Sequence, residues 1–136
     1  MNVIPQAIYT KLGSVTSPGS FHALTFGRYY FLEAPQNTGF PLAVFSIDGM
    51  DNDDQFGGSR VMRGSVSFDI YCESKGGAAS AMTIEEALFT LLDQTSFVTG
   101  GSYGTVSMQA LARGIPSVAD EFIVISTTYA LFTTRS

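Results

Sequence analysis

The sequence is poor in the residue types that build most catalytic and metal-binding sites. Its 136 residues include one cysteine, one histidine and no tryptophan. Cys72 has no partner for an intrachain disulfide, which fits a reducing compartment, and its alternation into the predicted core favours a buried small hydrophobe over a reactive thiol. His22 has no second histidine or cysteine cluster to complete a zinc site. We therefore expect a structural histidine, no bound metal and no cofactor.

Charged residues and long apolar runs are scarce as well. Charged side chains make up 14% of the chain, against about 25% in typical globular domains. Seven basic and twelve acidic residues give a net charge of −5, which argues against electrostatic capture of nucleic acid. No run approaches the ~20 apolar residues of a membrane span, and Met1–Pro5 lacks the basic start of a signal peptide. We expect a protein without membrane partners that acts where it is made and keeps neutral surface for subunit contacts.

Strand patterns, by contrast, are abundant. The length and the 45% hydrophobic fraction predict a single domain over residues 1–136. Ile4, Ile8 and Leu12 recur at helical spacing, and residues 14–27 are expected to form an ordered loop. Further elements are expected at 28–33 (strand), 42–47 (strand), 66–72 (strand), 78–94 (helix), 105–113 (strand) and 121–133 (strand). The order predicts an α+β fold, with two helices packed on one face of a largely antiparallel or mixed sheet.

Periodicity predicts the buried face of two of the expected strands and of one helix. The strand at 66–72 alternates with period two, placing Val66, Phe68, Ile70 and Cys72 on one face. The last strand places Ile123, Ile125, Thr127, Tyr129 and Leu131 on one face and Phe122, Val124, Ser126, Thr128 and Ala130 on the other. The expected buried stripe of the helix at 78–94 is Ala81, Ile84, Leu88, Leu91 and Leu92.

Gly100-Gly101-Ser102-Tyr103-Gly104 matches the G-x-S-x-G pattern of a hydrolase nucleophile. That chemistry needs the serine on a sharp turn from strand to helix, with a histidine downstream as base. Here the pattern precedes an expected strand, and His22 lies far upstream. A glycine-rich turn is the favoured interpretation, and a small serine hydrolase using Ser102 is the alternative from another class of function.

The segment Asp51–Ser59 is acidic and rich in glycine, so we expect a mobile loop. A calcium loop starting at Asp51 would need glutamate at its twelfth position, which is occupied by Met62. Docking onto a partner is the better functional interpretation, with Asp51, Asp53 and Asp54 as polar contacts and Phe56 as the aromatic anchor.

Three further residues are candidate contacts with a neighbouring subunit. Arg60 and Arg63 flank the start of the strand at 66–72, and they are either solvated charges or partners of an acidic loop on the next subunit. Phe89 lies at the boundary of the helical stripe, where it belongs either to the core or to an interface.

With these landmarks the chain resembles the tail-terminator, or tail-completion, proteins of long-tailed bacteriophages. The resemblance runs from the first helix to Tyr129–Phe132. It is carried by Pro35 with Phe40–Phe45, by the strand Val66–Tyr71, and by the Ala-rich helix ending in Leu91-Leu92-Asp93. The loop Ser14–Gly27 is longer than the family pattern.

The resemblance implies a non-enzymatic ring, usually of six subunits, that caps the tail tube and joins it to the head-side connector protein. Such a ring forms in the host cytoplasm and then belongs to the head-proximal end of the virion tail, with DNA only passing through the lumen. Contacts are expected at Asp51–Ser59, at the sheet edges and around Gly100–Gly104. A lumen lined by Lys11, Arg28, Arg60 and Arg63 would contradict passive passage of DNA. The alternative role is a connector or stopper component.

Overall fold

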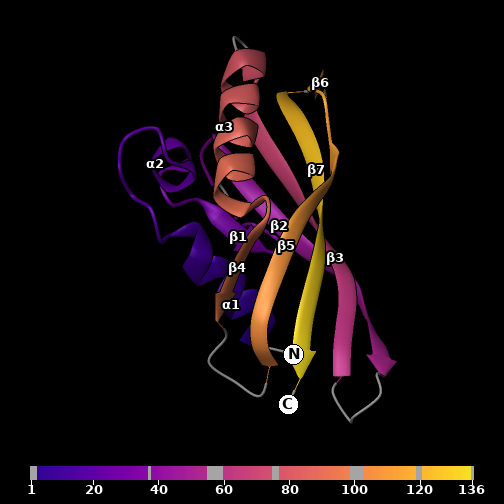
Figure 1. Cartoon of the computed structure of the whole chain (residues 1–136). Helices are drawn as coiled ribbons and strands as arrows, with labels where there is room; N and C mark the ends of the chain where they lie inside the picture. The colour runs from indigo at the N-terminus through magenta and orange to yellow at the C-terminus, as the bar shows by residue number, and fades with distance from the viewer. Residues whose placement is uncertain are drawn as a thin grey trace.

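The computed structural model describes residues 3–36, 38–54, 60–74, 77–98, 103–118 and 121–135. These ranges contain three helices and seven strands (Figure 1). In chain order the elements are α1 (Val3–Leu12), α2 (Phe21–Thr25), β1 (Tyr29–Phe31), β2 (Leu42–Asp54), β3 (Arg60–Glu73), α3 (Gly77–Leu92), β4 (Thr95–Val98), β5 (Tyr103–Arg113), β6 (Ser117–Val118) and β7 (Phe122–Arg135). The α+β class with a mixed sheet is confirmed.

All strands belong to one sheet with the order β1-β2-β3-β7-β5-β4, and β6 pairs with β7. Among the described strands the single parallel pair is β1 with β2, and the remaining pairs are antiparallel. β3 and β7 form the centre and pair continuously from Arg60↔Arg135 to Glu73↔Phe122. The two long central strands therefore set the register for the whole sheet.

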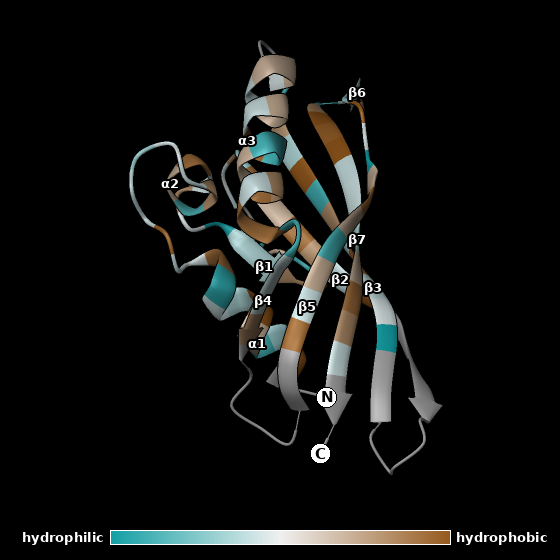
Figure 2. Ribbon diagram, viewed as in Figure 1, coloured by the Kyte–Doolittle hydropathy of each residue, from teal (hydrophilic) through white to brown (hydrophobic). Residues whose placement is uncertain are grey.

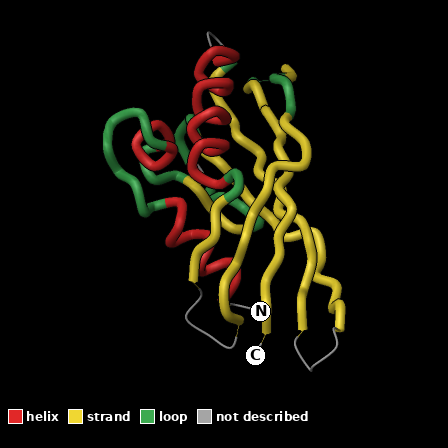
Figure 3. Tube along the Cα trace, in the orientation of Figure 1, coloured by secondary structure: helices red, strands yellow, loops and turns green. Residues whose placement is uncertain are grey.

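All three helices lie on one side of the sheet and leave the other side uncovered (Figures 1 and 3). α1 contacts β1, β4 and β5, whereas α3 lies across β3, β7 and β5. The core between the layers centres on Phe68, whose ring stacks on Phe45 at 5.5 Å and meets Tyr129 edge-on at 5.8 Å. No helix in the described ranges has the length and apolar character to cross a membrane.

The expected strand faces are confirmed. Val66, Phe68, Ile70 and Cys72 are buried, and so are Ile123, Ile125, Thr127, Tyr129 and Leu131. The alternation appears as hydrophobic and hydrophilic bands along β3 and β7 (Figure 2). On the helix-free face, Ser67 donates a hydrogen bond to Asp48 at 2.5 Å and Ser126 donates one to Asp69 at 2.6 Å.

The expectation of a loop starting at Asp51 is wrong. Residues 51–54 continue β2 and pair with Arg60–Arg63 of β3, after an irregularity between Ile47 and Met50. Asp and Asn are disfavoured in strands, so local composition suggested a loop. Pairing with the adjacent strand outweighs that preference. The paired backbone of residues 51–54 does not fit the loop of a calcium site, and the rest of the expected loop, residues 55–59 with Phe56, lies outside the described residues.

Three short elements are additional to the expected order. The segment predicted as an ordered loop contains α2, which is capped by the Ser20 hydroxyl accepting a hydrogen bond from Ala23 N at 3.2 Å. β4 follows α3 directly, and β6 adds two residues to the edge of β7. Each element is too short to give a periodic signal, and each is held by tertiary contacts.

Candidate interaction surfaces

The surroundings of the G-x-S-x-G pattern do not match a hydrolase nucleophile. The pattern lies between β4 and β5, which pair antiparallel as Thr95↔Met108 to Val98↔Thr105. Ser102 itself lies outside the described residues, and Tyr103 and Gly104 already belong to β5. A nucleophile elbow runs from a strand into a helix, whereas this chain continues into a strand. The glycine-rich turn is therefore the interpretation that the topology favours.

His22 and Cys72 are both used structurally. His22 Nδ1 lies 2.8 Å from the Tyr29 hydroxyl, and Cys72 is buried, which raises the pKa of its thiol. Within the described part of the chain, no three His, Cys, Asp or Glu residues gather closely enough to hold a metal ion.

Replacing Tyr29 by phenylalanine tests the role of His22. We expect the free energy of unfolding to fall by about 1 kcal/mol, because the substitution removes one hydrogen bond and leaves the imidazole nitrogen unpaired. Urea denaturation measures this change. Tyr9→Phe is the control, since Tyr9 is largely exposed and surface changes stay within about 0.5 kcal/mol. Equal effects of the two substitutions would contradict the assignment.

A β-bulge in β5 changes which way its last residues face. Ala110 pairs with Tyr129 and Ala112 with Thr128, so Leu111 has no partner in the register. The extra residue shifts the alternation, and Arg113 comes opposite the inward-facing Thr127. Arg113 therefore points toward α3, whereas uninterrupted alternation would have turned it to the helix-free face.

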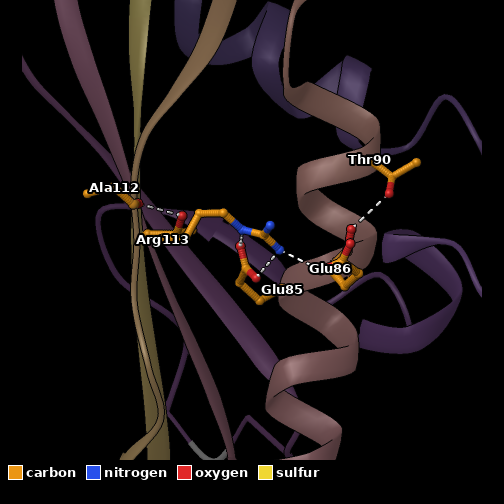
Figure 4. Close-up of polar contacts among 6 residues, drawn as sticks. Glu85, Glu86, Thr90, Ala112 and Arg113 are labelled. Carbon is orange, nitrogen blue, oxygen red and sulfur yellow. Dashed lines mark hydrogen bonds and ion pairs between the residues drawn. The ribbon is translucent and has the colours of Figure 1, made fainter.

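Arg113 forms an ion cluster with two glutamates of α3 (Figure 4). Its Nε and Nη2 donate to the two carboxylate oxygens of Glu85 at 2.9 and 2.7 Å, and Nη2 also donates to Glu86 at 2.5 Å. These hydrogen bonds, with Glu85 the larger contributor, raise the pKa of Arg113 above its ordinary value. The Glu85 side chain is only 7% exposed, so Arg113 is the partner that makes burial of its charge tolerable.

Phe89, one of the predicted contact residues, supports this cluster. The Arg113 guanidinium carbon lies 3.9 Å from the centroid of its ring, a cation–π geometry. Phe89 is half-buried, so part of its ring packs within the subunit. Its contact with a neighbouring subunit remains a prediction.

The β5–β6 rim, which we define as Leu111, Ile115 and Val118, is the most exposed apolar feature in the described residues. Ile115 is 83% and Val118 is 80% exposed. Gly114 allows the rim segment to lie close against β7, because a Cβ at this position would collide with the Ser126 carbonyl oxygen. Beyond Met108 the strand β5 no longer pairs with β4, so the rim lies along a sheet edge.

A second apolar surface lies at the opposite edge. The β1 patch, which we define as Phe26, Phe31 and Leu32, is also exposed. Within the described part of the chain β1 pairs only with β2, so the patch flanks the other edge of the described sheet. Phe26 adopts a left-handed backbone conformation at the end of α2. The guanidinium carbon of Arg28 lies 5.2 Å from the centroid of its ring. Arg28 also donates a hydrogen bond to Phe40 O at 2.9 Å.

The remaining predicted contact residues lie on one hairpin. Asp51 pairs in the backbone register with Arg63, Asp53 with Val61 and Asp54 with Arg60. Acidic and basic positions of the same chain thus lie opposite each other, and Arg63 is exposed. The two edge surfaces lie elsewhere in the fold, at the sheet edges, where contacts are expected from the sequence without any residue being identified.

The fold is shared with proteins of known structure, although no family model and no curated protein matches the chain. A chain from the virion of a native gene transfer agent particle superimposes with a TM-score of 0.69 and 17% identity, over 98% of this chain and 96% of that one. A second solved chain gives a TM-score of 0.68 and 17% identity, over 99% and 95%. At this identity the likeness establishes the common fold and nothing more.

Proposed function

We propose that this protein is a virion structural subunit that forms the tail-completion ring of a bacteriophage-like particle. The observation that carries the proposal is the pair of exposed apolar surfaces on opposite edges of one sheet. The fold of a gene transfer agent virion chain supports it, as does the resemblance to tail terminators. The ring would cap the tail tube and meet the head-side connector, with the resemblance favouring six subunits.

Two unlike surfaces on one subunit favour head-to-tail assembly. A contact between unlike patches is heterologous, and it closes into a ring when the rotation between neighbours permits. Self-pairing of a single patch would instead give a twofold dimer. The rim and the β1 patch differ in residues and in backbone context, one lying beside a bulge and the other beside a parallel strand. This difference supports a ring over a dimer.

The free energy expected from covering these apolar side chains is of the right order for reversible assembly. Each partly exposed Val, Leu, Ile or Phe contributes about 1–2 kcal/mol when it is covered. The six side chains of the rim and the β1 patch together contribute roughly 6–12 kcal/mol. Association itself costs an estimated 4–15 kcal/mol. We therefore expect single contacts to be weak, and assembly to depend on concentration or on a template such as the tail tube.

The helix-free face is compatible with DNA passing by without capture. Its central residues include Ser67, Asp69, Ser126 and Thr128, which are short and either neutral or acidic. These four side chains offer no cation to bind phosphate, whereas the exposed Arg63, on the same face of β3, lies nearer the Arg60 end of the strand. We include passive passage of DNA in the proposal on this basis.

Assembly measurements test the proposed function. Sedimentation across a concentration series should show subunits converting to one closed oligomer, and electron microscopy should show rings, either free or on the ends of purified tail tubes. Binding to tubes supports the terminator role, and binding only to the head-side adaptor supports the connector role instead. A protein that stays monomeric and ignores both partners would refute the proposal.

A further inference from the structure

The rim and the β1 patch lie level with each other across the sheet. Phe31 pairs with Phe45, which pairs with Phe68, then Thr127 and finally Arg113. This row of paired residues joins the centre of the β1 patch to the rim. A neighbour displaced sideways along the row brings its β1 patch to the rim without a shift along the strands. Such a head-to-tail contact closes into a ring when the rotation between neighbours permits.

We propose that the β5–β6 rim of one copy packs on the β1 patch of the next copy, forming the repeating contact of the ring. The inference rests on the proposed function and deepens it by assigning the two surfaces. The occupant of each surface is a second copy of this chain. It brings Leu111, Ile115 and Val118 of one subunit against Phe26, Phe31 and Leu32 of its neighbour.

Charge along the two edges favours this pairing. Arg28 lies at one end of the β1 patch, next to Tyr29. The row of paired residues that begins at Tyr29 crosses the sheet through Ala43 and Ile70 to Ile125 of β7. The residue before Ile125 pairs with β6, so this row reaches the other edge of the sheet next to β6. Glu121, which is exposed, follows β6 in the chain. Arg28 of one copy therefore faces the Glu121 end of the other.

One further charge next to the β1 patch lies near the Phe31 row. Glu33 is exposed and follows the β1 patch, whereas Arg113 lies in the Phe31 row on the rim side. Glu85 and Glu86 already partner that guanidinium, two carboxylates against one cation, so Glu33 adds no attraction there.

Site-directed crosslinking tests the pairing directly. Leu111→Cys and Leu32→Cys place one thiol on each surface, and native Cys72 is buried. After mild oxidation of assembled protein, we expect a mixture of the two single variants to crosslink as heterodimers. The double variant should give a ladder ending at the ring size. Self-crosslinking of Leu111→Cys alone, or no mixed crosslink in assembled rings, would overturn the inference.

Polar substitution provides a second measurement. Ile115→Ser combined with Val118→Ser should raise the half-assembly concentration at least tenfold, with unchanged far-ultraviolet circular dichroism. Met82→Ser is the matched control, because Met82 is an exposed apolar residue of α3 outside both surfaces, and it should assemble as the wild type does. Rings that form normally despite the rim substitutions refute the assigned contact and leave the ring function intact. A wild-type chain that never assembles refutes both.

Discussion

Replacing Arg113 by methionine is expected to lower the free energy of unfolding by about 3 kcal/mol. The substitution leaves Glu85 buried without its cation and removes two charge-assisted hydrogen bonds. Breaking a buried pair from one side costs about 3–5 kcal/mol, and we take the low end because the Arg113 side chain is 37% exposed and solvent screens it. Chemical denaturation at low protein concentration measures the change.

Two companion variants separate burial of the charge from loss of packing. Glu86→Gln should cost less than about 1 kcal/mol, because Glu86 is largely exposed and exposed pairs contribute little. Arg113→Met combined with Glu85→Met should recover much of the lost stability, since no charge is then left buried. A double variant as unstable as Arg113→Met alone would show that the packing of the guanidinium on Phe89, rather than the charge of Glu85, dominates.

Replacing Gly114 by valine is expected to cost about 2–3 kcal/mol and to abolish ring assembly. The new Cβ would collide with the Ser126 carbonyl oxygen. That oxygen belongs to the central strand β7, so the segment carrying Ile115 and β6 must move instead. Denaturation measures the stability, and sedimentation measures assembly.

Gly39→Ala is the control for this substitution. A Cβ at Gly39 meets the Arg28 guanidinium at 3.4 Å, an ordinary contact with a mobile side-chain end. We expect a change within about 0.5 kcal/mol. If Gly114→Val assembled normally, the position of β6 would not matter for the ring, and both the close approach at Ser126 and the rim contact would lose their assigned importance.

Much of the layer structure follows from periodicity. The alternation from Val66 to Cys72 and the α3 stripe predicted which faces are buried, because one face of each element must leave water. The predicted stripe included Leu91, which is only half-buried, and it lacked one buried position. Glu85 is buried beside Ala81 and Leu88, where a carboxylate is tolerated only with a partner. Arg113, its partner, is 28 residues away.

The two edge surfaces could not be predicted from the sequence, because they also depend on residues that are distant along the chain. Leu111 lies in an apolar strand segment, and its exposure follows from the loss of the β4 partner beyond Met108 and from the bulge at Ala110/Ala112, neither of which local composition shows. Phe31 and Leu32 looked like ordinary strand residues, since edge position depends on the strand order. Isolated apolar residues in a turn, such as Ile115, carry no periodic signal. Sheet order and bulges arise from tertiary pairing, which local patterns do not encode.

The central position of β7 has a consequence for how the molecule comes into being. β7 lies between β3 and β5, yet among the described strands it is the last to be synthesised. β3 has no partner on its β7 side until residue 135 has been made, so the part of the sheet formed by β1, β2 and β3 stays incomplete until then. Native structure thus waits for nearly the whole described chain to leave the ribosome, and nascent copies expose bare strand edges until then. We expect chaperone dependence to be greatest at this stage of biogenesis.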